Sequence, residues 1–270
     1  MLYFVATPIG NLKDVSFRAI ETLKSADLIL CEDTRTSLTF LNAYDIKKPL
    51  QSFHKFNYKT EVPKVIEQLK QGKTICLISD AGTPCISDPG TELIAELNRN
   101  NLKYSIIPGA SAFLNGFCLS GFDAPFVFVG FLPDNKKERR LLLENLKTQT
   151  FTLIFYCAPH DIKQTVKELY KDFGDRQACT VRELTKLYEE IEFFNLADGY
   201  PKEPRGEYVL VVKGLQTKIN ELNDLSILDH YNYYINLGMQ NNDAIKQVAK
   251  DMGVAKNFIY SHIVEVKKNK

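Results

Sequence analysis

The sequence predicts an α/β protein with two α/β domains and a small helical segment at its C-terminal end. Over the first half of the 270 residues, short apolar segments alternate with helical patterns, which is typical of a mostly parallel sheet covered by helices. In the second half, the later strand-like segments follow one another without long helices between them, which favours antiparallel pairing. Residues 241–266 then carry apolar side chains at helical spacing.

The first domain is expected over residues 1–120. The strand-like segments of the first half are residues 2–6, 28–31, 74–78, 104–107 and 126–129. The segments between them with helical spacing are residues 17–25, 62–71 and 92–100. Glycine, proline and aspartate gather at residues 121–133, and this composition indicates a domain boundary.

The second domain is expected over residues 121–216. Its predicted helices are residues 137–147 and 162–173, and its predicted strands are residues 152–156, 178–182, 188–194 and 208–213. A third segment, residues 224–270, is predicted to be helical with a break at Gly253. Two short helices joined at a glycine are typical of a helix-turn-helix or of a small helical cap. We favour the cap, because the shape of a fold alone does not establish DNA binding.

The composition limits the cellular compartment and the kinds of partner that we expect for this protein. No apolar run approaches the ~20 residues that a membrane-spanning helix needs, and residues 2–6 resemble a strand rather than a signal peptide. We therefore expect a cytoplasmic protein with no membrane partner. The six cysteines form no CxxC pair, so reduced core thiols are expected rather than disulfides or a metal site. A net charge of +1 argues against free nucleic acid as the partner, although residues 136–140 are locally basic.

Three polar loops follow predicted strands of the first domain. They are residues 7–11, 79–90 and 108–112. In an open parallel sheet, all three emerge at the carboxyl edge, where ligands bind. Their glycines and prolines allow close backbone approach to a ligand, and Ser111 suits a helix N-cap. Neither GxGxxG nor GxxxxGK[ST] is present, so the loops predict a ligand cleft that is not of the dinucleotide or triphosphate type.

These loops and several later motifs occur in a recognisable order over residues 2–214. They are Val5-Ala6-Thr7-Pro8-Ile9-Gly10-Asn11-Leu12, Cys31-Glu32-Asp33-Thr34-Arg35, residues 79–90, Pro108-Gly109-Ala110-Ser111-Ala112, Gly130-Phe131-Leu132-Pro133, Thr152-Leu153-Ile154-Phe155-Tyr156, Pro159-His160, Arg182-Glu183-Leu184-Thr185-Lys186 and Arg205-Gly206-Glu207. The chain resembles the tetrapyrrole methylases, and within them the family that 2′-O-methylates ribose in small-subunit ribosomal RNA. The twelve-residue loop 79–90 is the most specific motif. Cys157-Ala158 differs from the Glu-Ser that the resemblance predicts.

The resemblance implies two α/β domains with S-adenosylmethionine in the cleft between them, a homodimer, and a small helical C-terminal extension. It implies that the substrate is the ribose 2′-hydroxyl of a cytidine in the decoding region of 16S rRNA. The residues that it implies for cofactor contact are Pro8, Ile9, Asp80, Gly82, Thr83, Ile86, Ser111, Ala112, Tyr156, Cys157 and Leu184. Among these, we expect Thr83 to contribute its side chain.

Methyl transfer to an alcohol requires alignment of the reactants and a group that removes the hydroxyl proton. The first candidates for this base are Glu32, Asp33 and Glu183, and Asp80, Asp88 and His54 are also possible by residue type. A structural pair of acid and arginine is an equal alternative at 32–35. A surface ion cluster is the alternative for Glu183, and backbone capping is the alternative for Asp88.

RNA contact is expected from basic side chains and one aromatic side chain. The basic candidates are Arg35, Lys55, Lys136, Lys137, Arg139, Arg140, Arg182 and Lys186. Phe53 or Phe56 is expected to stack on a base. The near-neutral charge favours an assembled small ribosomal subunit as substrate. The rival hypotheses are a methylase of a tetrapyrrole or of a modified protein side chain on the same fold, and a ligand-responsive regulator that binds DNA through residues 241–266.

Overall fold

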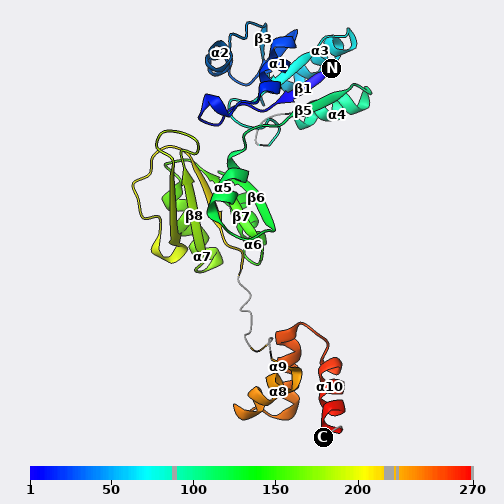
Figure 1. The fold of residues 1–270 in the computed structure, drawn as a ribbon, viewed down its shortest axis with the longest axis vertical. Coiled ribbons are helices and arrows are strands. Elements are labelled where there is room, and N and C mark those ends of the chain that lie inside the picture. Colours follow the sequence, from blue (N-terminus) through cyan, green and yellow to red (C-terminus); the bar gives the residue numbers. More distant parts are fainter. Residues whose placement is uncertain (87–89, 216–221, 223–224, 269–270) are drawn as a thin grey trace. The chain divides into compact units, whose positions relative to one another are not determined.

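The computed structural model describes residues 1–86, 90–215, 222 and 225–268, so Asp88 lies outside the described residues. The chain divides into two compact units, residues 1–215 and residues 216–270. The first unit contains two five-stranded sheets with helices on their faces (Figure 1). Within the described residues, no helix combines the length and the apolar character needed to cross a bilayer.

The first sheet is entirely parallel and has the strand order β3-β2-β4-β1-β5. Its strands are β1 (Leu2–Val5), β2 (Leu28–Cys31), β3 (Leu50–Ser52), β4 (Ile75–Ile78) and β5 (Tyr104–Ile107). Side chains of β2 and β4 are buried throughout, as is typical of central strands covered on both faces. The cores on the two faces use alternate residues of each strand, as shown by Phe4 and Val5 of β1, which belong to different cores.

Two helices cover each face of this sheet. The helices α1 (Phe17–Ser25) and α2 (Thr34–Ala43) pack on the face of Val5, and α3 (Tyr58–Lys70) and α4 (Thr91–Arg99) pack on the face of Phe4. The parallel sheet is as predicted, and α1 has the predicted bounds. Neither β3 nor α2 was predicted from the sequence. The segment 126–129, grouped above with the strands of the first half, belongs to the second sheet.

The second sheet has the strand order β6-β7-β10-β8-β9. Its strands are β6 (Phe126–Phe131), β7 (Thr152–Cys157), β8 (Gln177–Arg182), β9 (Glu190–Asn195) and β10 (Tyr208–Val212). β6 and β7 are parallel, whereas β10 is antiparallel to both β7 and β8, and β9 is antiparallel to β8. The predicted antiparallel component is therefore confirmed. α6 (Lys136–Leu146) and α7 (Ile162–Phe173) cover one face.

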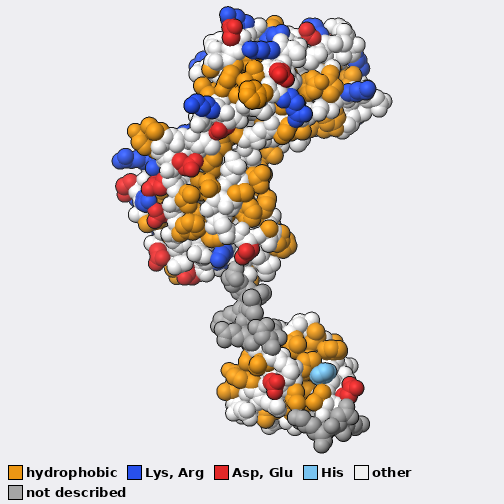
Figure 2. Space-filling model, viewed as in Figure 1, with side chains coloured by type: hydrophobic (Ala, Val, Ile, Leu, Met, Phe, Trp, Pro, Cys, Tyr) orange, Lys and Arg blue, Asp and Glu red, His pale blue; other side chains and the backbone are white. Residues whose placement is uncertain are grey.

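The other face of the second sheet is covered by α5 (Ala112–Ser120), of which the sequence indicated only the start, through Ser111 as a helix N-cap. Gly116 allows this close packing, because a Cβ there would lie 2.6 Å from Cγ1 of Val209 on β10. The outer side of α5 carries exposed Leu114 and Leu119. Figure 2 shows hydrophobic side chains on the surface around α5 and β6. The helix thus connects the loop after β5 directly to the second sheet.

The second unit is a bundle of three helices, α8 (Ile227–Asn236), α9 (Asn241–Met252) and α10 (Lys256–Lys268). Its own core includes Tyr231, Val248 and Ile259. Gly253 ends α9 in the left-handed conformation, with φ +65°, as the predicted break requires. α8 precedes residue 241 and falls within the segment 224–270 that was predicted to be helical.

Candidate active site

Two loops of the first sheet are held together by backbone pairing. The N–H of Thr7 donates to the carbonyl oxygen of Gly82 at 2.9 Å, and the N–H of Gly82 donates back to the oxygen of Thr7 at 3.1 Å. The Thr7 hydroxyl also donates to the oxygen of Ser79 at 3.2 Å. Because β4, β1 and β5 are adjacent and parallel, these loops leave the same edge of the sheet. Gly82 has φ +81°, a conformation that favours glycine.

The third loop is tied to the second by a side chain. The Thr83 hydroxyl donates to the carbonyl oxygen of Ala110 at 3.2 Å. The third loop also lies close to the end of β1, since a Cβ on Gly109 would lie 2.9 Å from Cβ of Ala6. It leads into the amino end of α5, where the N–H groups of the first turn have no partner within the helix. All three predicted loops therefore meet.

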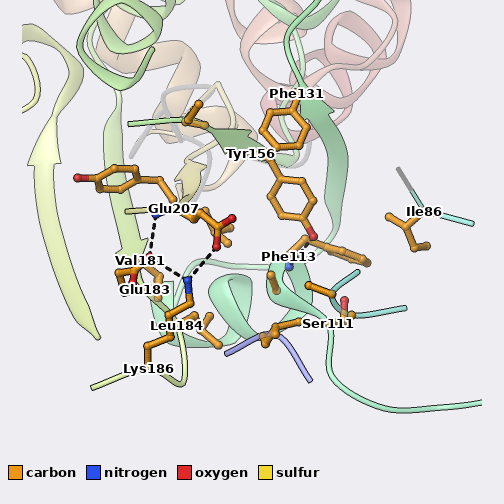
Figure 3. A pocket seen from close by; sticks show the side chains of 18 of the residues that line it. Ile86, Ser111, Phe113, Phe131, Tyr156, Val181, Glu183, Leu184, Lys186 and Glu207 are labelled. Carbon is orange, nitrogen blue, oxygen red and sulfur yellow. Dashed lines mark hydrogen bonds and ion pairs between the residues drawn. The ribbon is translucent and has the colours of Figure 1, made fainter. Parts of the chain in front are cut away.

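The second sheet supplies the opposite wall. β6 and β7 end, and the antiparallel β10 begins, at the same edge of the sheet, and β8 ends there as well. The Tyr156 hydroxyl accepts a hydrogen bond from the N–H of Phe113, in the first turn of α5, at 3.2 Å. Figure 3 shows the ring of Tyr156 pointing toward Phe113 and Ser111, with Phe131 beyond it. The two walls are thus linked by a hydrogen bond as well as by the chain.

A cavity of about 440 Å³ lies between the walls. Its apolar lining includes Ile9, Phe113, Phe131, Tyr156 and Val209. This volume is within the range of ~300–1,000 Å³ for small-molecule sites, which are lined mainly by apolar side chains with a few polar groups.

The polar side chains of the second wall form one connected group. Lys186 Nζ lies 3.0 Å from Oε1 of Glu183 and 3.0 Å from Oε2 of Glu207 (Figure 3). The N–H of Glu207 donates to Glu183 Oε1 at 3.0 Å. Burial opposes ionisation of Glu183, but the Glu207 N–H and the Lys186 ammonium outweigh it and hold the pKa of Glu183 below its ordinary value. The site therefore carries an ionised carboxylate at neutral pH.

Two glycines make room for this group. Gly206 has φ +67°, and a Cβ on it would lie 2.4 Å from Oε1 of Glu183. Gly10, in the first loop, lies against the loop after β8, and a Cβ there would lie 2.5 Å from Cγ of Lys186. The N–H of Asn11 donates to Oγ1 of Thr185 at 3.1 Å in the same region. The first loop thus contacts the second wall directly.

Comparisons with known proteins agree on one family. The family model described as Tetrapyrrole (Corrin/Porphyrin) Methylases matches residues 1–198. The chain is 44% identical over 269 residues to the ribosomal RNA small subunit methyltransferase I of Halalkalibacterium halodurans, covering 96% of this chain and 93% of that protein. It is 41% identical over 218 residues to the protein of the same name from Thermotoga maritima, covering 79% of this chain and 98% of that protein.

The chain belongs to the ribosomal RNA small subunit methyltransferase I family of tetrapyrrole methylases. Solved structures show the same fold. Diphthine synthase matches with a TM-score of 0.61 at 18% identity, over 79% of this chain and 89% of that one. A uroporphyrin-III-C-methyltransferase from Thermus thermophilus matches with a TM-score of 0.55 at 16% identity, over 78% of this chain and 93% of that one.

A methyltransferase of this family uses S-adenosylmethionine as its methyl donor. The cavity fits this group by size and by chemistry. Its aromatic and aliphatic walls suit an adenine ring and the alkyl groups on a sulfonium, and the backbone of the Gly82 and Ser111 loops offers polar groups at its edge. Cys157 lies in the wall, but burial raises the pKa of its thiol to about 12, so it remains protonated and does not act as a nucleophile.

Most residues that the sequence analysis assigned to the cofactor line this cavity of the methyltransferase. They are Ile9, Asp80, Gly82, Thr83, Ile86, Ser111, Ala112, Tyr156, Cys157 and Leu184. Pro8 is not among the lining residues. The Thr83 hydroxyl donates to the carbonyl oxygen of Ala110 and joins two loops, and its expected contact with the cofactor stays a prediction.

The three first candidates for the base separate in the structure. Glu183 lines the cavity, whereas Glu32 and Asp33 do not. Asp33 caps α2 by accepting from the N–H of Arg35 at 2.8 Å, and it also pairs with the Arg35 guanidinium at 2.9 Å. The hydrogen bonds from Arg35 lower the pKa of Asp33 to about 2. Asp33 and Arg35 therefore form the structural pair of acid and arginine that the sequence left as an alternative.

The expected RNA residues are also dispersed. Lys186 lines the cavity. Arg182 pairs with Glu190 at 3.1 Å, and Arg139 is half-buried and pairs with Glu168 at 2.6 Å. The other basic candidates are exposed, namely Arg35, Lys55, Lys136, Lys137 and Arg140.

Several lining residues, most of them in the second wall, were not predicted from the sequence. They are Phe113, Phe131, Val181, Glu207, Tyr208 and Val209. Glu207 belongs to the recognised motif Arg205-Gly206-Glu207, but the motif alone assigned it no role. The glycine between the two charged residues was the available signal, because a glycine beside a charged motif often marks a close approach.

Proposed function

We propose that this chain methylates the ribose 2′-hydroxyl of a cytidine in the decoding region of 16S rRNA, with the small ribosomal subunit as substrate. The names of its relatives support a ribosomal RNA substrate. The observation that carries the chemistry is the ionised carboxylate of Glu183 in the wall opposite the three loops. We propose that the protein works in the cytoplasm.

In this proposal, Glu183 is the catalytic residue that takes the hydroxyl proton. Its Oε1 already accepts from the N–H of Glu207 and faces Lys186 Nζ, which leaves Oε2 for the ribose hydroxyl. When bound, S-adenosylmethionine supplies a methyl group that its sulfonium charge has already activated. The remaining requirement is alignment, and the walls on both sides of the cavity provide a fixed frame for it.

Lys186 acts as a positioning residue. Its ammonium contacts both carboxylates, and the aliphatic part of its side chain lies against Gly10 of the first loop. Removing it would leave Glu183 and Glu207 facing each other without a counter-charge. Lys186 therefore keeps Glu183 both ionised and in place.

The RNA is proposed to cross the carboxyl edge of the first sheet. Arg35 at the start of α2 and Phe56 after β3 follow neighbouring strands of that sheet, and both side chains are exposed. Phe56 is 84% exposed with Lys55 Nζ 5.1 Å from its ring centroid, whereas Phe53 is 3% exposed and buried in the core. Phe56 is therefore the stacking residue in this proposal, and Phe53 is not.

A homodimer is proposed on the surface of α5 and β5. Leu114 and Leu119 of α5 are exposed, as are Tyr104 and Ile106 of β5, the edge strand of the first sheet. Exposed apolar side chains of this kind favour a protein contact. Sedimentation of the wild-type protein and of a Leu114→Glu variant tests this, with a monomeric variant as the expected result.

Transfer of labelled methyl groups tests the function. Small subunits from cells that lack the gene for this protein are expected to accept label on RNA, and free short RNA is expected to be a poorer substrate. Label in a tetrapyrrole or in a protein side chain would support the rival methylase instead. Binding of duplex DNA with a steep salt dependence, in the absence of methyl transfer, would support the regulator.

A further inference from the structure

The hairpin loop between β8 and β9, residues 183–189, lies between two cavities. Its first part, Glu183 to Lys186, lines the candidate active site. A second cavity of about 510 Å³ is lined by Glu183 and by Tyr188, near the other end of the loop. A ligand that occupies both cavities at once must therefore pass over this loop.

The backbone of the loop is held at several points. Glu183 and Thr185 both have positive φ, at +50° and +66°. The N–H of Lys186 donates to the oxygen of Glu183 at 2.9 Å, and the N–H of Thr185 donates to Oε2 of Glu189 at 2.6 Å. The loop is thus a fixed support rather than a loose connection.

This support carries two exposed apolar side chains at its tip. Leu187 is 88% exposed and Tyr188 is 70% exposed. Neither contributes to the described cores. Exposed apolar side chains beside a binding site favour a role in binding rather than in folding.

The second cavity is lined mainly by charged residues. Arg182 and Lys202 both pair with Glu190 in its wall. Arg205 is exposed, and within the described part of the chain no carboxylate partner is recorded for its guanidinium. A cavity with one aromatic ring and an available guanidinium matches the two chemical parts of a nucleotide, since the ring stacks on a base and the guanidinium binds a phosphate.

We infer that the second cavity binds the RNA nucleotide that flanks the methyl acceptor, with its base on Tyr188 and its phosphate on Arg205, while Leu187 and Tyr188 keep the two nucleotides apart. This inference rests on the proposed RNA substrate. The charged residues of the lining favour RNA over a second copy of this chain, because contacts between copies have apolar centres with few charged groups.

The test is the steady-state KM for small subunits from cells that lack the gene, measured with the full chain. Tyr188→Ala is expected to raise this KM about 5- to 100-fold, as expected for the loss of one base stack. Tyr188→Phe keeps the ring and is expected to stay near the wild-type value. The matched control is Tyr170→Ala, an exposed tyrosine near the end of α7 that lines neither cavity. Affinity for S-adenosylmethionine and the melting temperature are expected to be unchanged in all three.

Arg205→Ala tests the phosphate contact separately. It is expected to reduce the slope of log KM against log salt concentration by about 0.7, the value for one phosphate on a single strand. Arg99→Ala, at the far end of α4, is the matched control and is expected to leave the slope unchanged.

An unchanged KM in Tyr188→Ala, with wild-type enzyme that methylates RNA, would overturn the inference alone. A change of oligomeric state in Tyr188→Ala would overturn it in favour of a contact between copies. A wild-type protein that transfers no methyl group to RNA would overturn both the inference and the proposed function.

Discussion

Glu183 and Glu207 are joined by two hydrogen bonds, and a backbone N–H group is the donor in each. The N–H of Glu183 donates to the carbonyl oxygen of Glu207 at 3.0 Å, and the N–H of Glu207 donates to Oε1 of Glu183 at 3.0 Å. The loop after β8 is therefore fixed to the segment that precedes β10. The position of the Glu183 carboxylate depends on this pair and on the residue beside it, Gly206.

Gly206→Ala is expected to displace the Glu183 carboxylate, because the new Cβ would lie 2.4 Å from Oε1. We expect kcat to fall about 10- to 100-fold, as for a small misplacement of a reacting group, with a smaller effect on affinity for S-adenosylmethionine. The control is Gly199→Ala, which has a similar φ of +72° and no atom within 4 Å of the added Cβ. Equal loss of activity in both variants would show that backbone strain, and not the carboxylate, is responsible.

Lys186→Met is expected to shift the pH profile of kcat. In the wild-type protein the pKa of Glu183 is below its ordinary value, so Glu183 is fully ionised over the neutral range. Its titration therefore does not reduce kcat at neutral pH. Burial raises the pKa and the Lys186 ammonium is one of the groups that lower it, so removing the ammonium is expected to raise the pKa of Glu183. Activity of the variant is then lost at a higher pH as the solution is acidified. Lys163→Met, which breaks the exposed pair with Glu203, is the control and should leave the profile unchanged.

Gly116→Ala is expected to destabilise the first unit. The added methyl group would meet Cγ1 of Val209 at 2.6 Å and push α5 away from β10, at a cost of about 1–3 kcal/mol in the free energy of unfolding. In the double variant with Val209→Ala, the space is restored, so the two losses are expected to be less than additive. Chemical denaturation of the four proteins measures this, and strict additivity would contradict the close packing.

Phe56→Ala is expected to weaken RNA binding. The loss of one exposed stacking ring should raise the KM for small subunits about 5-fold or more, without changing affinity for S-adenosylmethionine. Phe151→Ala is the matched control, because Phe151 precedes β7 and lies at the edge of the second sheet away from the cavity. Equal KM values for the two variants would remove Phe56 from the proposed RNA surface.

Much of the cavity was predictable because it follows from a local rule. A loop that follows a strand of a parallel sheet must leave at the carboxyl edge, so three polar loops sufficed to locate the first wall. The second wall did not follow in this way. Glu207 comes before its strand rather than after it, and only the antiparallel direction of β10 brings it beside Glu183. The direction in which two strands pair depends on contacts between segments that are distant in the sequence, and the local sequence pattern does not predict those contacts.

The missed elements have physical causes of the same kind. α5 is apolar on most of its surface, because one side packs on the second sheet and Leu114 and Leu119 are exposed on another, so it lacks a clear amphipathic period. β3 has only three residues, with Gln51 at its centre. Asp33 was considered as the catalytic base, whereas its carboxylate caps α2. An acid after a strand fits either role, and only the position of the helix distinguishes them.

The central claim is that the cavity brings the Glu183 carboxylate to a ribose hydroxyl of 16S rRNA. The most direct measurement is mass spectrometry of nucleosides from 16S rRNA, after reaction of S-adenosylmethionine with small subunits from cells that lack the gene. We predict one 2′-O-methylcytidine in the decoding region with the wild-type protein, formed about 100-fold more slowly or more with Glu183→Gln. A methyl group on a base or on a protein, or an undiminished rate with Glu183→Gln, would contradict the account.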